Sequence, residues 1–265
     1  MSRPTIPEVV PSAVAELVEK LLAKLTPPPA KRKRDPSRID CYEAFDAAEL
    51  FGRRCWCALD MAIVSDLSAF AAVFPMHLDS NEEHPLELFR LLIKYWLPEE
   101  TAKKLRDKVP YLQWAERGWI TLTEGNEVDF GVIETEIAEF AEQYRLEEIR
   151  YDRAYAAQLT QNLELRHGIQ RVEFPQTIMN YTLPSKLFER LIKLKQIRHQ
   201  GNPILTWQIG HVSIKEDNNN NIRPVRPKKG DHRTVDGVQA TIMALSGALG
   251  ACGVADDWDG TVEYV

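Results

Sequence analysis

The chain has 265 residues, of which 44% are hydrophobic and 27% charged, a composition typical of a globular protein that buries a sizeable core. Its formal net charge of -6 argues against a protein held to nucleic acid by overall charge, although local basic tracts can still contact phosphates. No apolar stretch reaches the roughly 18 residues of a membrane span, and no signal peptide begins the chain, so we expect a cytoplasmic protein.

Residues 1–40 are predicted to hold an amphipathic helix and a linker. Apolar side chains repeat at helical spacing over SAVAELVEKLLAKL, residues 12–25. The following TPPPAKRKRDPSR combines three consecutive prolines with a basic run, which favours an extended segment. We therefore expect the main domain over residues 41–250 and an acidic, loose tail over residues 251–265.

An antiparallel meander of three strands is predicted at the start of this domain. The apolar and aromatic run over residues 54–64 suits a central strand, and SAFAAVFPM and LELFRLLIKYWLP suit its neighbours. Cys55 and Cys57 fall in the first strand, where alternation is expected to point them in different directions. Because the chain also lacks a CxxC pair, no zinc site is expected.

Helices and strands then alternate. Asp129 can cap a helix with a clear apolar stripe, which leads into the strand LEEIRYD, a helix over residues 155–166 and the short strand QRVEF. This order implies parallel strands covered by helices. Asp152 would lie at the carboxyl end of one of them, the edge at which open α/β sheets bind ligands.

The last part of the domain is predicted to contain three helices and a hairpin. Ser185 is expected to cap the helix SKLFERLIKLKQ, and Pro203 is expected to open the next one. VSIKED and IRPVRP are joined by four asparagines and predict a hairpin. The final helix is predicted over residues 234–249, with Asp236 in its first turn.

Three aspartates, Asp60, Asp152 and Asp236, stand where an apolar element meets a loop. Because a carboxylate at such a place is costly to desolvate, it is usually paired, hydrogen-bonded or bound to a cation. Carboxylates suit Mg²⁺ or Mn²⁺, and two such ions about 4 Å apart can clamp a phosphodiester. Asp66 is a candidate fourth ligand. The alternative is that Asp152 and Asp236 cap helices and Asp60 pairs with an arginine such as Arg153.

Basic side chains near these acids are candidates for contacts with phosphate. Lys229, His232 and Arg233 precede Asp236, and Arg153 follows Asp152. His232 could also protonate a leaving group. A solvated basic loop and a structural ion pair at Arg153 are the alternative interpretations.

Three groups of residues carry a resemblance to a known family. The turn LD-x₅-DLSA, the junction YDR-x₃-QL and the segment HRTVDGVQATIMAL occur in this order between about Cys41 and Leu249. Together they resemble the carboxyl-terminal nuclease domain of tailed-phage terminase large subunits. The resemblance implies an RNase H-like α/β fold, with a mixed sheet of an antiparallel meander and parallel strands flanked by helices.

The same resemblance implies a metal-dependent DNA endonuclease that cuts concatemeric viral DNA during genome packaging. Carried over by position, it makes Asp60, Asp152 and Asp236 catalytic metal ligands, with Asp66 near them, for Mg²⁺ or Mn²⁺ and two expected ions. The implied substrate is double-stranded DNA. The implied setting is the host cytoplasm, where a phage or prophage protein would work with the small terminase subunit, the portal and a separate ATPase motor.

The sequence departs from the family pattern in two respects. Nothing in it matches GxxxxGK[ST], and residues 1–40 are too few for an ATPase motor, so ATP hydrolysis is not predicted. Ala58 stands two residues before the first acid, where the family often has glycine.

Two other functions stay open on sequence alone. The chain could be a catalytically silent terminase remnant or a docking module for packaging partners or DNA. It could also be another RNase H-like enzyme that acts on RNA–DNA hybrids or in recombination. Whether Asp60, Asp152 and Asp236 bind metal together separates the docking module from the nuclease.

Overall fold

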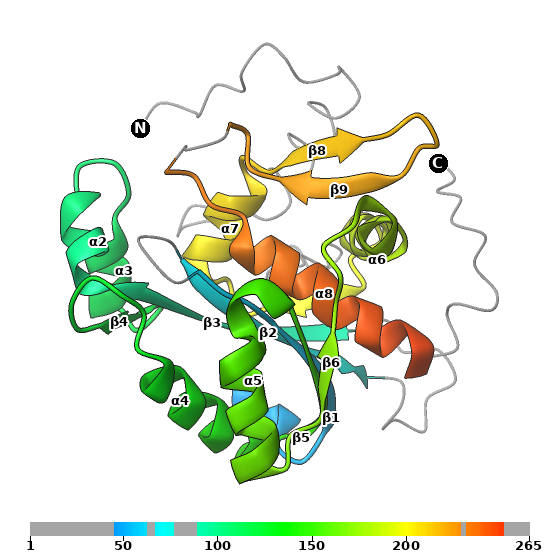
Figure 1. Cartoon of the computed structure of the whole chain (residues 1–265). Coiled ribbons are helices and arrows are strands. Elements are labelled where there is room, and N and C mark those ends of the chain that lie inside the picture. Colours follow the sequence, from blue (N-terminus) through cyan, green and yellow to red (C-terminus); the bar gives the residue numbers. More distant parts are fainter. Residues whose placement is uncertain (1–44, 63–66, 77–88, 229–231, 252–265) are drawn as a thin grey trace, which may run out of the picture.

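The protein is built on a mixed sheet, described here from a computed structural model over residues 45–62, 67–76, 89–228 and 232–251 (Figure 1). Within these residues seven strands pair in the order β4 (Thr121–Thr123), β3 (Phe89–Pro98), β2 (Ser68–Pro75), β1 (Arg54–Asp60), β5 (Arg145–Tyr151) and β6 (Arg171–Glu173), with β7 (Ile197–His199) also paired to β3. Strands β1 to β3 form the predicted antiparallel meander. Strand β5 runs parallel to β1 and β6 parallel to β5, as the alternation of helices and strands predicts. The expected fold class is confirmed.

Helices cover both faces of the sheet (Figure 1). One face carries α4 (Phe130–Gln143), α5 (Arg153–His167) and a 3₁₀ helix (Ala47–Leu50). The other carries α2 (Glu99–Lys104), α3 (Tyr111–Glu116), α6 (Ile178–Lys193), α7 (Pro203–Ile209) and α8 (Asp236–Ala251). The predicted hairpin forms from β8 (Ser213–Glu216) and β9 (Ile222–Val225), and β9 packs against α6. No helix among the described residues has the length and apolar character to cross a bilayer.

The two central strands are buried on both faces, and their side chains alternate between the two helical layers. In β1, Cys55, Cys57 and Leu59 join the core beneath α4 and α5, whereas Trp56 and Ala58 join the core beneath α8. In β2 the residues facing α8 are small, namely Ala69, Ala71 and Val73. This small-residue surface lets α8 lie close to the sheet, where it packs on β1 and β2.

A buried polar network holds the first turn of α8 in place. The side-chain oxygen of Gln208, on α7, accepts hydrogen bonds from the Tyr95 hydroxyl and from the Gly237 backbone N–H, each at 3.0 Å. The Gln208 amide nitrogen donates to the Thr234 hydroxyl at 2.8 Å. A Cβ on Gly237 would lie 1.9 Å from the Tyr95 hydroxyl oxygen, so this position has no space for a larger residue. The network therefore fixes the position of Asp236, the residue before Gly237.

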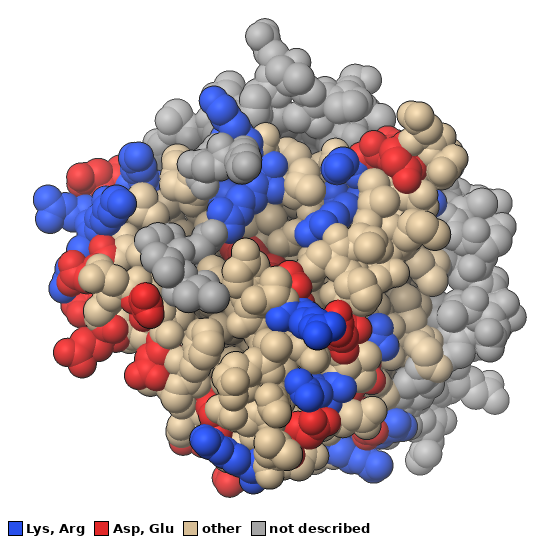
Figure 2. All heavy atoms as spheres, in the orientation of Figure 1, with Lys and Arg blue, Asp and Glu red and all other residues tan. Residues whose placement is uncertain are grey.

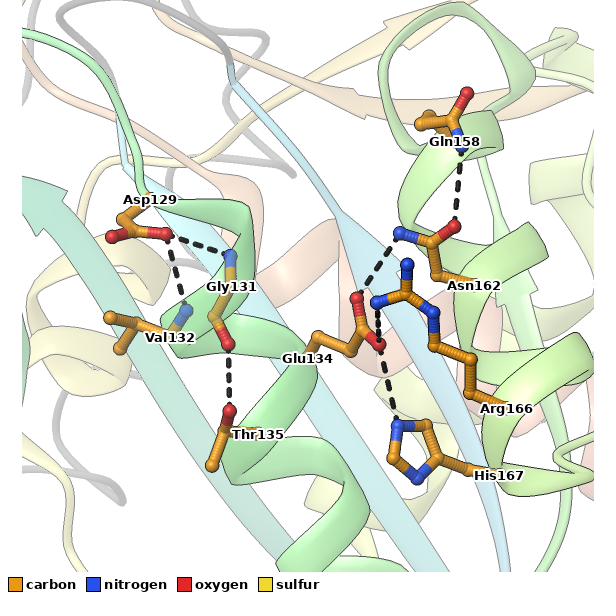
Figure 3. Close-up of polar contacts among 9 residues, drawn as sticks. All are labelled: Asp129, Gly131, Val132, Glu134, Thr135, Gln158, Asn162, Arg166 and His167. Carbon is orange, nitrogen blue, oxygen red and sulfur yellow. Dashed lines mark hydrogen bonds and ion pairs between the residues drawn. The ribbon is translucent and has the colours of Figure 1, made fainter.

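Helices α4 and α5 are joined by a polar cluster around the buried Glu134 (Figure 3). Asn162 and Arg166 of α5 donate to its carboxylate at 3.2 and 3.1 Å, and the His167 ring lies 3.4 Å away. Burial alone would raise the pKa of Glu134, but these hydrogen bonds outweigh it and the pKa lies below its ordinary value. Asp129 caps α4 through the Gly131 and Val132 N–H groups, as predicted. The cluster thus fixes α5, whose N-terminus carries Asp152.

Two sequence-based predictions are corrected by the structure. Ser185 does not cap a helix, because α6 begins seven residues earlier with Thr177 as its cap and continues through Pro184. A proline inside a helix removes one backbone hydrogen bond and usually bends or ends the helix. Here the helix continues because Tyr181, Leu187 and Leu191 all bury their side chains in the core.

Cys55 and Cys57 do not point in different directions. Residues i and i+2 of a strand share a face, and the two buried sulfur atoms lie 3.8 Å apart in the core. The predicted N-terminal helix and linker, the acidic tail, Asp66 and Lys229 lie outside the described residues.

Replacement of Gly237 tests the packing of α8. We expect Gly237→Ala to lower the free energy of unfolding by about 2 kcal/mol, because the new methyl group must displace Tyr95 or Gln208. Gly250→Ala, in the same helix, is the matched control, since a Cβ there meets nothing within 4 Å. It should be neutral or stabilising by up to about 1 kcal/mol. Urea unfolding of both variants measures the difference, and equal stability of Gly237→Ala and wild type would contradict the packing.

Protonation of His199 is expected to destabilise the protein at low pH. The side chain is 4% exposed, and burial lowers its pKa to about 4, below the ordinary value of 6.5. Since the folded state binds the proton more weakly than the unfolded state, stability is full above pH 6.5 and falls as the pH drops toward 4. The loss by pH 4 is on the order of 3 kcal/mol.

The variant His199→Asn separates this effect from other titrations. The Asn oxygen can replace Nδ1 as acceptor for the Gly201 N–H, a contact of 3.1 Å in the wild type. We expect the unfolding free energy of the variant to depend less steeply on pH between 4 and 6.5. An identical pH dependence in both proteins would show that His199 is not the group responsible.

Candidate functional site

Asp60 and Asp152 are brought together by the pairing of β1 with β5. Leu59 pairs with Tyr151 as the last registered pair of these parallel strands, and each aspartate is the next residue of its chain. Neighbouring strands lie about 4.8 Å apart, so the two residues end adjacent strands at the same edge. Successive side chains of a strand point to opposite faces of the sheet. Because Leu59 and Tyr151 lie in the core beneath α4 and α5, the aspartates that follow them are directed to the other face, which α8 covers.

Asp236 arrives from a third element and completes the group. It is the first residue of α8 and is 6% exposed. The three aspartates line one cavity of about 450 Å³, together with Met61, Ala62, Tyr155, Gln176, Arg223, Arg226 and Gln239. The convergence that their positions in the sequence suggested is therefore present in the fold.

The charges of the aspartates act on two buried tyrosines near the cavity. Burial, and after it the negative charge of Asp60, raises the pKa of Tyr181 well above its ordinary value, and Asp152 adds to the effect. Burial and then the charge of Asp236 raise the pKa of Tyr95 in the same direction. Both phenols therefore stay neutral hydrogen-bond donors, Tyr181 to Gln176 at 2.7 Å and Tyr95 to Gln208.

Two arginines also line the cavity. They come from the hairpin segment, by which we mean β8, β9 and the residue that follows β9. Arg223, on β9, donates to both the backbone and side-chain oxygens of Gln176, and its guanidinium lies over the Tyr181 ring at 4.9 Å. Arg226 pairs with Asp236, with 3.4 Å between Nη2 and Oδ1. In Figure 2 acidic atoms are visible inside the hollow and Lys and Arg side chains gather on its hairpin side. The cavity thus combines three carboxylates with two guanidinium groups.

Backbone contacts hold the hairpin segment in this position. The Gln239 amide of α8 donates to the Pro224 carbonyl at 3.1 Å, and the Ile222 N–H donates to the Thr182 hydroxyl of α6 at 3.0 Å. At the turn, Asp217 accepts hydrogen bonds from the Asn219 and Asn221 N–H groups. The arginines therefore project from a segment anchored to two helices.

The aspartates have the donor chemistry for a hard divalent cation, and Asp152 and Asp236 are also engaged in contacts within the protein. Asp152 caps α5 by accepting from the Ala154 N–H at 3.0 Å, and Asp236 pairs with Arg226. In the described part of the chain, no three or more His, Cys, Asp or Glu side chains are arranged as a metal-binding group. Three carboxylates on one cavity nevertheless fit such an ion, because their oxygens are the ligands that Mg²⁺ and Mn²⁺ prefer.

The other candidate site residues predicted from the sequence either do not line the cavity or lie outside the described residues. Arg153 is the first residue of α5, and His232 and Arg233 lie in the segment before α8. None of these three is among the described residues that line the cavity. Asp66 and Lys229 lie outside the described residues, so their predicted roles stay predictions.

Sequence reasoning missed most of the neutral and basic lining. Arg223 and Arg226 belong to the predicted hairpin strand IRPVRP, and their spacing of three residues does not indicate that both line the cavity of the acids. Gln176 and Tyr155 carried no signal, although Tyr155 follows Asp152 by three residues and is 50% exposed. A helix places its residues i and i+3 on one face, which could have indicated Tyr155.

Comparison with known proteins identifies the family. The model of the terminase large subunit endonuclease domain matches residues 35–251. Protein YmfN of Escherichia coli K12 is 28% identical over 206 residues, covering 75% of this chain and 44% of that protein. The large terminase subunit of Enterobacteria phage HK97 is 24% identical over 201 residues, covering 75% of this chain and 38% of that protein.

A solved structure agrees with the fold. The crystal structure of the HK97 bacteriophage large terminase superposes with a TM-score of 0.63 and 22% identity, covering 77% of this chain and 43% of that one. This chain therefore spans less than half the length of these relatives. With the family model matched over most of its length, the chain belongs to the terminase large subunit endonuclease domain family.

Proposed function

We propose that this chain is a metal-dependent endonuclease that cuts double-stranded DNA, of the kind that processes concatemeric viral DNA during genome packaging. The observation that supports it best is the convergence of Asp60, Asp152 and Asp236, from three separate elements, on one cavity that also holds two arginines. Membership of the endonuclease domain family agrees with this chemistry. The catalytic domain would be residues 41–250.

Asp60, Asp152 and Asp236 would hold Mg²⁺ or Mn²⁺, with two ions expected and Asp66 as a further ligand. The bound ions would supply activation of water and stabilisation of charge on the phosphate oxygens. Asp60 and Asp152, on adjacent strand ends, would fix one side of the ligand set because the sheet holds them rigidly. Asp236 would close the set from α8, whose first turn is held by Gln208.

The arginines would bind the DNA. A phosphodiester brought to the aspartates adds negative charge to a cavity that already has three carboxylates, so it needs positive neighbours. Arg223 and Arg226 provide two guanidinium groups, whose planar donors match phosphate oxygens. Because phosphate contacts carry no sequence information, we expect cutting with little sequence preference.

Directed cutting of a genome would need partners beyond the endonuclease domain. We propose that these are an ATPase motor, the small terminase subunit and the portal.

Neutral replacements of the three aspartates test the proposal. Asp60→Asn, Asp152→Asn and Asp236→Asn should each reduce nicking of supercoiled plasmid with Mn²⁺ or Mg²⁺ by at least about 100-fold, or about 3 kcal/mol of transition-state stabilisation. Asn is chosen because it can still cap α5 at position 152. Asp107→Asn, where the side chain is 89% exposed, is the matched control and should cut like wild type.

EDTA should abolish cutting by the wild type. In a separate assay, cutting of an RNA–DNA hybrid is compared with cutting of the DNA duplex. Circular dichroism confirms that each variant is folded. A folded wild type that cuts with neither ion would overturn the proposal and favour a docking module. Preferential cutting of the hybrid would instead favour an enzyme that acts on RNA–DNA hybrids.

A further inference from the structure

The ion pair between Arg226 and Asp236 occupies a carboxylate that the proposed metal site requires. Their contact of 3.4 Å is longer than the roughly 2.8 Å typical of a charge-assisted hydrogen bond. The Asp236 side chain is 9% exposed and the Arg226 side chain 30% exposed, so the guanidinium reaches the carboxylate from the open side of the cavity. The pair therefore compensates a buried negative charge without being tightly held.

Arg223, three residues earlier, is held much more firmly. Its guanidinium donates to the Gln176 carbonyl and side-chain oxygens and lies over the Tyr181 ring. Gln176 is fixed in turn by the Tyr181 hydroxyl at 2.7 Å. Reorientation of Arg223 would break several buried contacts, whereas the Arg226 side chain is 30% exposed and its ion pair with Asp236 is long.

We propose that Arg226 exchanges partners during the reaction cycle: it pairs with Asp236 before a divalent cation binds, and it turns to a phosphate of the DNA when the cation takes Asp236. This inference rests on the proposed function, and it names the residue that couples cation binding to DNA binding.

Charge repulsion explains why Arg226 would leave Asp236 when a cation binds. Asp236 would exchange the Arg226 guanidinium for a bound divalent cation as its positive partner, because the two like charges would repel each other. Arg226, which lines the cavity, would then have the entering phosphate as its next negatively charged partner. Its guanidinium holds two donors in a fixed plane that matches two phosphate oxygens, a geometry that the ammonium of lysine lacks.

Cation affinity gives the first test. With Mn²⁺ or Ca²⁺ as the only ligand, Arg226→Gln should bind the ion roughly five- to tenfold more tightly than wild type, because the competing guanidinium is gone. Arg145→Gln makes the same charge change at the opposite end of β5, on a side chain that is 68% exposed, and should bind the ion like wild type. Isothermal titration calorimetry measures both.

The salt dependence of DNA binding gives the second test. For a short duplex in Ca²⁺, shown to be intact on a denaturing gel, Arg226→Gln should reduce the slope of log affinity against log salt by about 1. In EDTA the variant and the wild type should have the same slope, because Arg226 of the wild type is then paired with Asp236 and does not contact phosphate. Arg226→Lys should restore the slope in Ca²⁺ but bind the duplex less tightly than wild type. The effect of Arg145→Gln on the slope should be the same in Ca²⁺ and in EDTA.

Several results would overturn the exchange. An equal loss of slope in Ca²⁺ and EDTA would mean a permanent phosphate contact, and no loss in either would mean a purely structural ion pair. Unchanged or weaker cation binding by Arg226→Gln would also contradict it, provided that Arg226→Lys shows the site to be folded. A wild type that binds the ion and DNA with these dependences but never cuts would refute the proposed nuclease and leave the exchange standing.

Discussion

The register between β1 and β5 decides where the acidic side chains of this protein meet. Because Leu59 pairs with Tyr151, Asp60 and Asp152 follow as neighbours at one edge of the sheet. The chain must first pass through β2, β3 and α4 before β5 can pair in parallel with β1, so the two acids are far apart in sequence. Alternation along the strands then directs both toward α8. A shift of one residue in either strand would send its carboxylate into the core beneath α5.

The close approach of α8 supplies the third carboxylate and sets the charge balance of the cavity. Small residues on β2, Ala58 of β1 and the absence of a side chain at Gly237 allow the helix to approach, and Gln208 ties its first turn to Tyr95. Three carboxylates in one partly buried cavity would repel one another without positive neighbours. The hairpin segment provides Arg223 and Arg226, so the same cavity holds three carboxylates and two guanidinium groups.

Local patterns in the sequence predict much of this structure. The meander, the cap at Asp129, the hairpin and the three acids follow from the alternation of apolar residues, from capping chemistry and from the cost of desolvating carboxylates. The start of α6 could not be predicted, because tertiary burial of Tyr181 and Leu187 outweighs the helix-breaking tendency of Pro184. The pairing of Arg226 with Asp236 could not be predicted either, since it depends on how the hairpin packs against α6 and α8.

The central claim is that Asp60, Asp152 and Asp236 bind divalent cations together in one cavity. An anomalous difference map from crystals soaked in Mn²⁺ tests it most directly, because manganese scatters anomalously and its position is then seen independently of activity. The account predicts peaks within the cavity, in contact with carboxylate oxygens of all three aspartates and lost in crystals of Asp60→Asn. An empty cavity at saturating Mn²⁺, or peaks only on surface carboxylates elsewhere, would contradict it.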